Sequence, residues 1–95
     1  AQGTQALFFN LGAAESKKAY TLLQQLRSSG TAAEIYPEIV KMDKQFKYAE
    51  KKGIPFVVII GSREQENGTC VVKNIQTGEQ QIMEQAALTS FSFEA

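Results

Sequence analysis

The stretch Gly53-Ile54-Pro55-Phe56-Val57-Val58-Ile59-Ile60-Gly61 decides the fold of this 95-residue chain. Its centre, Phe56 to Ile60, is an unbroken apolar run, which is typical of a central β-strand that is covered on both faces. We therefore predict a strand over Pro55–Ile60, in a sheet that carries helices on both sides.

Upstream of this strand, apolar runs alternate with helical periods, the pattern of βαβ units. Strands are predicted over Ala6–Leu11, stopped by Gly12, and over Ala32–Tyr36, ended by Pro37. Helices are predicted over Ala14–Ser29 and from about Val40 to Lys52, each ended by a glycine. The residues predicted to form their buried faces are Ala19, Leu22, Leu23 and Leu26 in the first helix, and Met42, Phe46 and Ala49 in the second.

Downstream, Ser62–Glu66 is predicted to be a polar loop and Asn67-Gly68 a turn. A hairpin of Thr69–Ile75 and Glu79–Met83 follows, and Glu84–Phe93 is predicted to be an amphipathic helix with Ala87, Leu88 and Phe91 on its apolar face. The chain therefore predicts a three-layer α/β/α fold with a mixed five-stranded sheet in the order 2-1-3-4-5. Three strands are parallel, and the C-terminal hairpin is antiparallel.

Composition limits the chemistry. The formal net charge is zero, so no global field draws the chain to nucleic acid or membrane. The chain has no histidine and a single cysteine, Cys70. It therefore lacks the histidine of a catalytic triad, nearly all of the usual zinc ligands, and the second cysteine of an internal disulfide. No apolar run approaches the ~20 residues of a membrane span, and we expect a cytoplasmic protein. Because the chain begins at Ala1 without an initiator Met, we expect residues 1–95 to be a single domain of a longer protein.

The predicted second helix holds the densest group of basic residues. At ~100° per residue, four of its lysines share one side, roughly opposite the predicted apolar face. They are Lys41, Lys44, Lys47 and Lys51. This stripe is either a solvated helix face or a surface that contacts phosphates without reading sequence.

Other polar residues are candidates for a site, and each has an ordinary structural alternative. Lys73 and Asn74 face opposite ways on an alternating strand, where one of them could read bases in an unstacked loop. Gly12 precedes a helix N-terminus that could hold an anion, but the tight turn of a βα junction is the favoured explanation. Asn10 is an amide among apolar residues, which either ties the backbone or meets a ligand. Cys70 has no neighbour in the sequence that would activate it, and we interpret it as a core residue.

Five short motifs follow one another along the chain: Lys-Gln-Phe-Lys-Tyr-Ala (44–49), Gly-Ile-Pro (53–55), Glu-Asn-Gly-Thr (66–69), Val-Lys-Asn (72–74) and Thr-Gly-Glu-Gln (77–80). Together they resemble the C-terminal anticodon-binding domain of histidyl-tRNA synthetases, of class IIa, over about residues 5–93. The resemblance implies that this domain docks the anticodon loop of histidine tRNA and performs no catalysis itself. It also implies a parent enzyme, a homodimer, that activates histidine with ATP and Mg²⁺ in a separate catalytic domain.

Carried onto this sequence, the resemblance implies RNA contacts by eight residues. They are Glu66, Lys73, Asn74, Lys44, Gln45, Lys47, Asn10 and Gly12. Two departures from the family pattern lie near the lysines: Asp43 replaces a frequent lysine, and Glu38-Ile39-Val40 replaces a polar entry to the helix.

Two other functions remain open from the sequence. Synthetase-like paralogues use the same domain as a non-catalytic regulatory or subunit-interaction module, and the sequence upstream would distinguish that case. A small flavodoxin-like or thioredoxin-like enzyme is disfavoured because the chain has no CxxC motif and no phosphate-binding loop.

Overall fold

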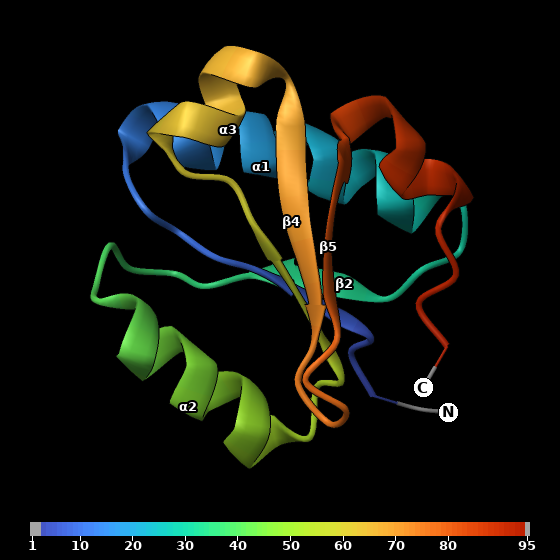
Figure 1. The fold of residues 1–95 in the computed structure, drawn as a ribbon. Coiled ribbons are helices and arrows are strands. Elements are labelled where there is room, and N and C mark those ends of the chain that lie inside the picture. Colours follow the sequence, from blue (N-terminus) through green and yellow to red (C-terminus); the bar gives the residue numbers. More distant parts are fainter. Residues whose placement is uncertain (1–2, 95) are drawn as a thin grey trace.

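The computed structural model describes residues 3–94 of the chain (Figure 1). The strands are β1 (Ala6–Phe8), β2 (Ala33–Ile35), β3 (Phe56–Ile59), β4 (Thr69–Asn74) and β5 (Gln80–Glu84). The helices are α1 (Ala13–Ser28), α2 (Met42–Lys52), α3 (Ser62–Asn67) and the 3₁₀-helix η1 (Gln85–Ser90).

The five strands form one mixed sheet in the order β2-β1-β3-β4-β5. β1 is parallel to both of its neighbours, so that Leu7 lies opposite Glu34 on one side and Val57 on the other. β4 runs antiparallel to β3 and to β5. The predicted strand order and strand directions are confirmed.

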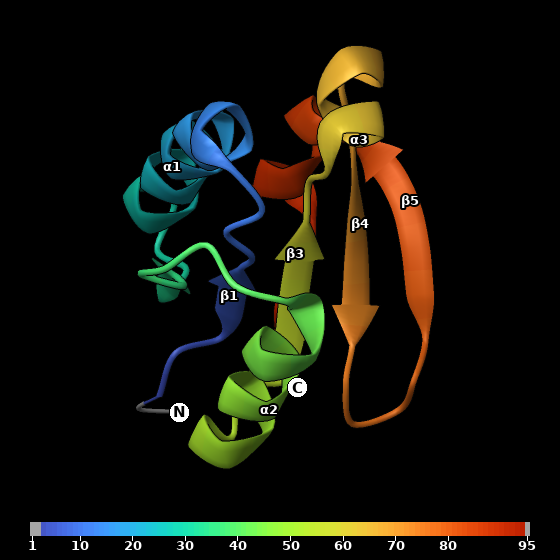
Figure 2. The same cartoon turned by 90° about the vertical axis from the view of Figure 1, so that its left-hand side faces the viewer.

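Helices cover the two faces of the sheet unequally (Figure 2). On one face, α1 and the C-terminal segment pack over a core that runs from β2 to β4 and includes Phe8, Val58, Cys70, Leu23 and Leu88. On the other face α2 lies alone, over a smaller core made of Leu7, Phe9, Tyr36, Ala49, Ile54 and Val57. The fully buried residues of this second core end at β3, and half-buried Ile75 packs against it from just after β4. Part of the sheet beyond β3 has no helix over it.

The segment after β3 is a short helix rather than the predicted loop. The carboxylate of Glu64 accepts a hydrogen bond from the Gly61 N–H at 2.8 Å, which caps the first turn of α3. Gly68 ends the helix with φ 72°, the left-handed region that glycine adopts without strain. All six residues of α3 are polar, so the helix has no apolar face that periodicity could reveal. The only signals of this helix in the sequence are the residues that begin and end it.

The C-terminal prediction of an α-helix over Glu84–Phe93 is also wrong. Only Gln85–Ser90 is helical, and it is a 3₁₀-helix. Its buried residues, Gln85 and Leu88, are three apart, as the 3₁₀ period of three residues requires, whereas Ala87 is exposed. The chain then extends so that Phe93 packs edge-on against Phe56, with ring centroids 5.5 Å apart.

Candidate nucleic-acid interface

The antiparallel direction of β4 separates the predicted site residues into two groups. Asn10 and Gly12 follow β1, so they lie at the carboxyl edge of the parallel strands, where α3 and the start of β4 also lie. Lys73 and Asn74 are at the opposite end of β4. At ~3.3 Å per residue, Thr69 and Lys73 are about 13 Å apart along the strand. Glu66 on α3 therefore lies next to the start of β4, and Lys73 lies near its other end.

Gln45 joins α2 to the end of β1. Its Oε1 accepts a hydrogen bond from the Asn10 N–H at 2.8 Å, and its Nε2 donates to the Asn10 carbonyl and to the Val40 carbonyl, each at 2.9 Å. The side chain is fully buried. All of these hydrogen-bonding partners are backbone groups, so Gln45 is placed to hold the chain and not to contact a ligand in this conformation.

The burial of Gln45 changes the predicted inner face of α2. The buried residues of this helix are Gln45 and Ala49, whereas Met42, predicted to be buried, is 38% exposed. A polar side chain can take the inner position because its hydrogen bonds offset the cost of burial.

The side chain of Asn10 makes one further hydrogen bond and leaves one acceptor atom without a partner among the described residues. Its Nδ2 donates to the Tyr36 carbonyl at 3.1 Å, which ties β1 to the end of β2. Its Oδ1 is buried and has no hydrogen-bond partner among the described residues. This oxygen can accept one more hydrogen bond, from a water molecule or a ligand.

Two of the helices that start at the carboxyl edge, α1 and α3, share the local sequence Gly-x-x-Glu. Gly12 precedes α1 and Gly61 precedes α3, and in both cases the glutamate three residues later folds back over the glycine. An added Cβ on Gly12 would collide with the carboxylate of Glu15, and one on Gly61 would lie 2.9 Å from Oε1 of Glu64. The positive helix ends therefore already face carboxylates, which disfavours a phosphate beside Gly12. The repeated Gly-x-x-Glu spacing is the signal in the sequence that marks both helix starts.

Lys73 lies on the face of the sheet that carries α2. Its Nζ is 5.3 Å from the ring centroid of Phe46, a cation–π distance, and Phe46 in turn packs edge-on against Phe9 at 4.7 Å. A hollow of about 240 Å³ lies beside the ammonium group. It is lined by Phe46, Glu50, Lys73, Ile75 and Gly78.

Asn74 faces the other way, as the alternation of the strand predicted. Its Oδ1 accepts hydrogen bonds from the N–H groups of Gln76 and Thr77, at 2.9 and 3.2 Å. The side chain therefore shapes the turn between β4 and β5. The structure does not bring Asn74 to the surface that Lys73 occupies.

The predicted lysine stripe of α2 is solvent-exposed, and it lies on the outer side of the helix. At ~100° per residue, Lys47 is nearly opposite the buried pair Gln45 and Ala49, while Glu50 turns toward Lys73. A shallow hollow of about 540 Å³ runs along this outer side. It is lined by Val40, Lys41, Asp43, Lys44 and Lys47. Asp43 thus stands within the basic stripe.

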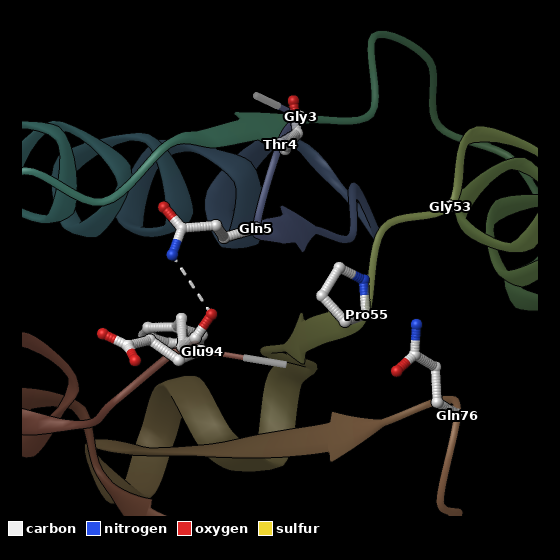
Figure 3. A pocket seen from close by; sticks show the side chains of 8 residues that line it. Gly3, Thr4, Gln5, Gly53, Pro55, Gln76 and Glu94 are labelled. Carbon is white, nitrogen blue, oxygen red and sulfur yellow. Dashed lines mark hydrogen bonds between the residues drawn. The ribbon is translucent and has the colours of Figure 1, made fainter. Parts of the chain in front are cut away.

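Another hollow, of about 530 Å³, lies at the amino edge of the parallel strands (Figure 3). There the Gln5 amide donates to the Phe93 carbonyl at 3.2 Å and accepts from the Ala32 N–H at 2.9 Å, which joins the first and last described segments. None of the predicted site residues lines this hollow. Its lining is Gly3, Thr4, Gln5, Gly53, Pro55, Gln76, Phe93 and Glu94.

The described residues offer few further reactive or metal-binding groups. Cys70 is buried, and its burial raises the pKa of the thiol to about 11, so the reactive thiolate is scarce at neutral pH. Within residues 3–94, His, Cys, Asp and Glu side chains form no group of three or more that could hold a metal ion. No helix in the described part of the chain has the length and apolar content needed to cross a membrane.

Comparison with known proteins places this geometry in context. A family model described as "Anticodon binding domain" matches residues 5–91. Histidine–tRNA ligases of Bacteroides fragilis and Porphyromonas gingivalis are 44% and 40% identical to the chain, over 85% and 92% of it. The chain spans only 18% and 19% of those two relatives.

Solved structures give the same match. The histidyl-tRNA synthetase of Nostoc sp. PCC 7120 superposes with a TM-score of 0.89 at 31% identity, over 94% of this chain and 21% of that one. The apo histidyl-tRNA synthetase of S. aureus gives 0.87 at 31% identity, over 98% of this chain and 24% of that one.

Proposed function

The chain belongs to the anticodon-binding-domain family, and from this premise we propose that it recognises the anticodon loop of histidine tRNA as part of a longer, cytoplasmic histidine–tRNA ligase. One observation carries the proposal. Relatives that are 44% identical are histidine–tRNA ligases, of which the match covers 18%, and the family model described as anticodon binding spans residues 5–91 of this chain.

The proposal divides the work between two parts of the parent enzyme. Residues 1–95 form one anticodon-binding domain, and the remainder of the parent, a homodimer, activates histidine with ATP and Mg²⁺ and transfers it to the tRNA.

Recognition in this proposal uses the two ends of β4 for different nucleotides. Glu66 is on the helix just before Thr69, and Thr69 and Lys73 are about 13 Å apart along β4, which corresponds to roughly four stacked nucleotides at ~3.4 Å each. The carboxylate of Glu66 accepts hydrogen bonds from base donors such as the guanine N–H edge, and the Lys73 ammonium donates to base acceptors or phosphates. Specific reading of RNA needs such unpaired bases, which an anticodon loop supplies.

The other predicted residues contribute in two further ways. Lys44 and Lys47, exposed on the outer side of α2, attract phosphates of the anticodon arm without reading sequence. Asn10, Gln45 and Asn74 act mainly by fixing the backbone that carries the contacting groups, through the hydrogen bonds described above. Gly12 contributes by leaving room for the Glu15 carboxylate at the start of α1.

Binding at this remote domain serves the reaction by placing the tRNA. Contacts to the anticodon loop hold the acceptor end in a productive position at the catalytic domain, so binding energy far from the reacting atoms lowers the barrier. Because the chain has no net charge, we expect weak phosphate attraction and modest affinity for tRNA when the domain is alone.

A titration of the ¹⁵N-labelled chain with anticodon stem-loops tests the proposal. The histidine stem-loop should shift amide resonances near Glu66 and Lys73, and a stem-loop with all three anticodon bases replaced should bind more weakly. Equal affinity for both RNAs, or no shifts with either at millimolar concentration, would refute anticodon recognition by this domain.

A further inference from the structure

One part of the sheet has no cover on the face that carries α2. The core beneath α2 reaches from Tyr36 beyond β2 to Val57 on β3, and β4 and β5 extend past it (Figure 2). Among the described residues, Val71 on β4 and Ile82 on β5 belong to neither core cluster. The opposite face of β4 is covered, since Cys70 and Val72 are buried in the core with α1 and η1, and Met83 of β5 packs half-buried against the same core.

Three aliphatic side chains form a row across this open area. Ile59 pairs with Val71, and Val71 pairs with Ile82, in the register of the antiparallel ladders. Residues directly opposite in a ladder point to the same face with their Cβ atoms about 5 Å apart. Ile59 and Val71 are half-buried, and Ile82 is 70% exposed. The row is therefore continuous from the edge of the α2 core to solvent.

Polar residues lie on both sides of the row, on the same face. The pair Thr69 and Glu84 precedes it, and the pair Lys73 and Gln80 follows it. We call the row and these four flanking residues the open strip. Lys73 thus borders the apolar row at the end where it also contacts Phe46.

We propose that unpaired bases of the anticodon loop lie with their faces on the row Ile59–Val71–Ile82, and this inference rests on the proposed function. Every base offers the same apolar face, so contact with the row adds affinity without selecting sequence. The flanking Lys73 then contacts base edges or backbone phosphates of the nucleotides that lie on the row, and the more distant Glu66 contacts base edges.

The size of the open strip favours bases over a protein partner. Two inter-strand spacings of ~4.8 Å and four residues of β4 give about 10 by 13 Å, or roughly 130 Å². A stable protein interface buries about 800 Å² on each side. One or two planar rings of the size of an aromatic side chain cover the strip. The ammonium of Lys73 at its border complements the charge of RNA.

The test compares two exposed isoleucines of the chain. Ile82→Gln removes the outer end of the row, and Ile39→Gln is the matched control, because Ile39 is 61% exposed in the segment before α2. With the histidine stem-loop and with a loop of altered anticodon, Ile82→Gln should raise Kd about fivefold for both RNAs. Ile82→Phe, which enlarges the stacking surface, should bind both RNAs at least as tightly as the wild type.

A direct readout accompanies the affinities. Ring currents of bases lying on the row should move the methyl resonances of Ile59, Val71 and Ile82 upfield on RNA binding, while the Ile39 methyls stay in place. Equal Kd values for Ile82→Gln and Ile39→Gln, or a loss for only one of the two RNAs, would overturn the inference. If wild-type binding remains anticodon-dependent in those cases, the proposed function stands without the strip.

A protein partner is the other outcome that the test can detect. If Ile82→Gln leaves RNA binding unchanged and instead weakens subunit association in the full-length synthetase, the open strip is a protein interface and the inference fails.

Discussion

The amide of Gln45 satisfies both backbone groups of Asn10, accepting from its N–H at 2.8 Å and donating to its carbonyl at 2.9 Å, and so joins α2 to the carboxyl end of β1. Asn10 lies just after the end of β1, and there the glutamine side chain takes the place of the backbone hydrogen bonds of a neighbouring strand. The position of the helix that carries Phe46, Lys44 and Lys47 depends on this side chain.

Replacement of Gln45 by methionine should destabilise the domain more than its change in size implies. The two backbone groups of Asn10 would be buried without partners, which costs about 1–3 kcal/mol for each unsatisfied group. Urea unfolding monitored by circular dichroism measures the loss, and Gln24→Met on the exposed side of α1 is the control. A difference below about 1 kcal/mol between the two variants would show that Gln45 does not hold the helix.

Charge reversal on the outer side of α2 should weaken RNA binding without changing preference. Lys44→Glu with Lys47→Glu removes phosphate contacts, so Kd should rise for every stem-loop alike and the slope of log K against log salt should become shallower. Lys17→Glu with Lys18→Glu on α1 changes the charge equally on the opposite face of the sheet and serves as the control. A loss confined to one stem-loop would contradict a phosphate role.

Glu66 should affect discrimination rather than stability. Its side chain is exposed on α3, so Glu66→Ala should leave the unfolding transition within about 0.5 kcal/mol of the wild type. In the full-length synthetase, the ratio of kcat/KM for histidine tRNA to that for tRNA with a changed anticodon should fall, by roughly tenfold for one lost charge-assisted hydrogen bond. Gln65→Ala, on the same helix, provides the comparison, and an unchanged ratio for Glu66→Ala would remove this residue from the site.

Asn74 should act through the hairpin. Asn74→Ala removes the acceptor for two turn N–H groups, and we expect a loss of about 1 kcal/mol in stability together with reduced anticodon discrimination. Asn74→Asp keeps an acceptor at the same place and should restore both properties. If Asn74→Asp restores stability but not discrimination, the amide group itself contacts RNA.

Much of the fold was predictable because its signals are local and agree with one another. The buried run around Val58, the helical period of Leu22, Leu23 and Leu26, and the right-handed crossover rule together give the strand order that the structure has. The alternation of β4 correctly placed Lys73 and Asn74 on opposite faces.

The errors arose where hydrogen bonds outweigh hydropathy. Gln45 is buried because it bonds to the backbone of Asn10, which follows β1 and lies 35 residues away in sequence. The hydrophobic periodicity of α2 contains no information about such a distant partner. α3 was missed because its start depends on Glu64 capping Gly61, not on an apolar face. The open strip depends on how far α2 reaches across the sheet, which is a tertiary distance.

The paired Gly-x-x-Glu junctions have a consequence for selectivity among phosphorylated molecules. Sheets of this topology hold mononucleotides where helices begin, but here Glu15 and Glu64 serve as built-in counter-anions at both positions. We therefore expect free ATP not to bind at these two helix starts. Its addition should leave the amide resonances of residues 12–15 and 61–64 unchanged. Two places where a sheet of this topology can bind a phosphate are thus already occupied by carboxylates of the chain itself.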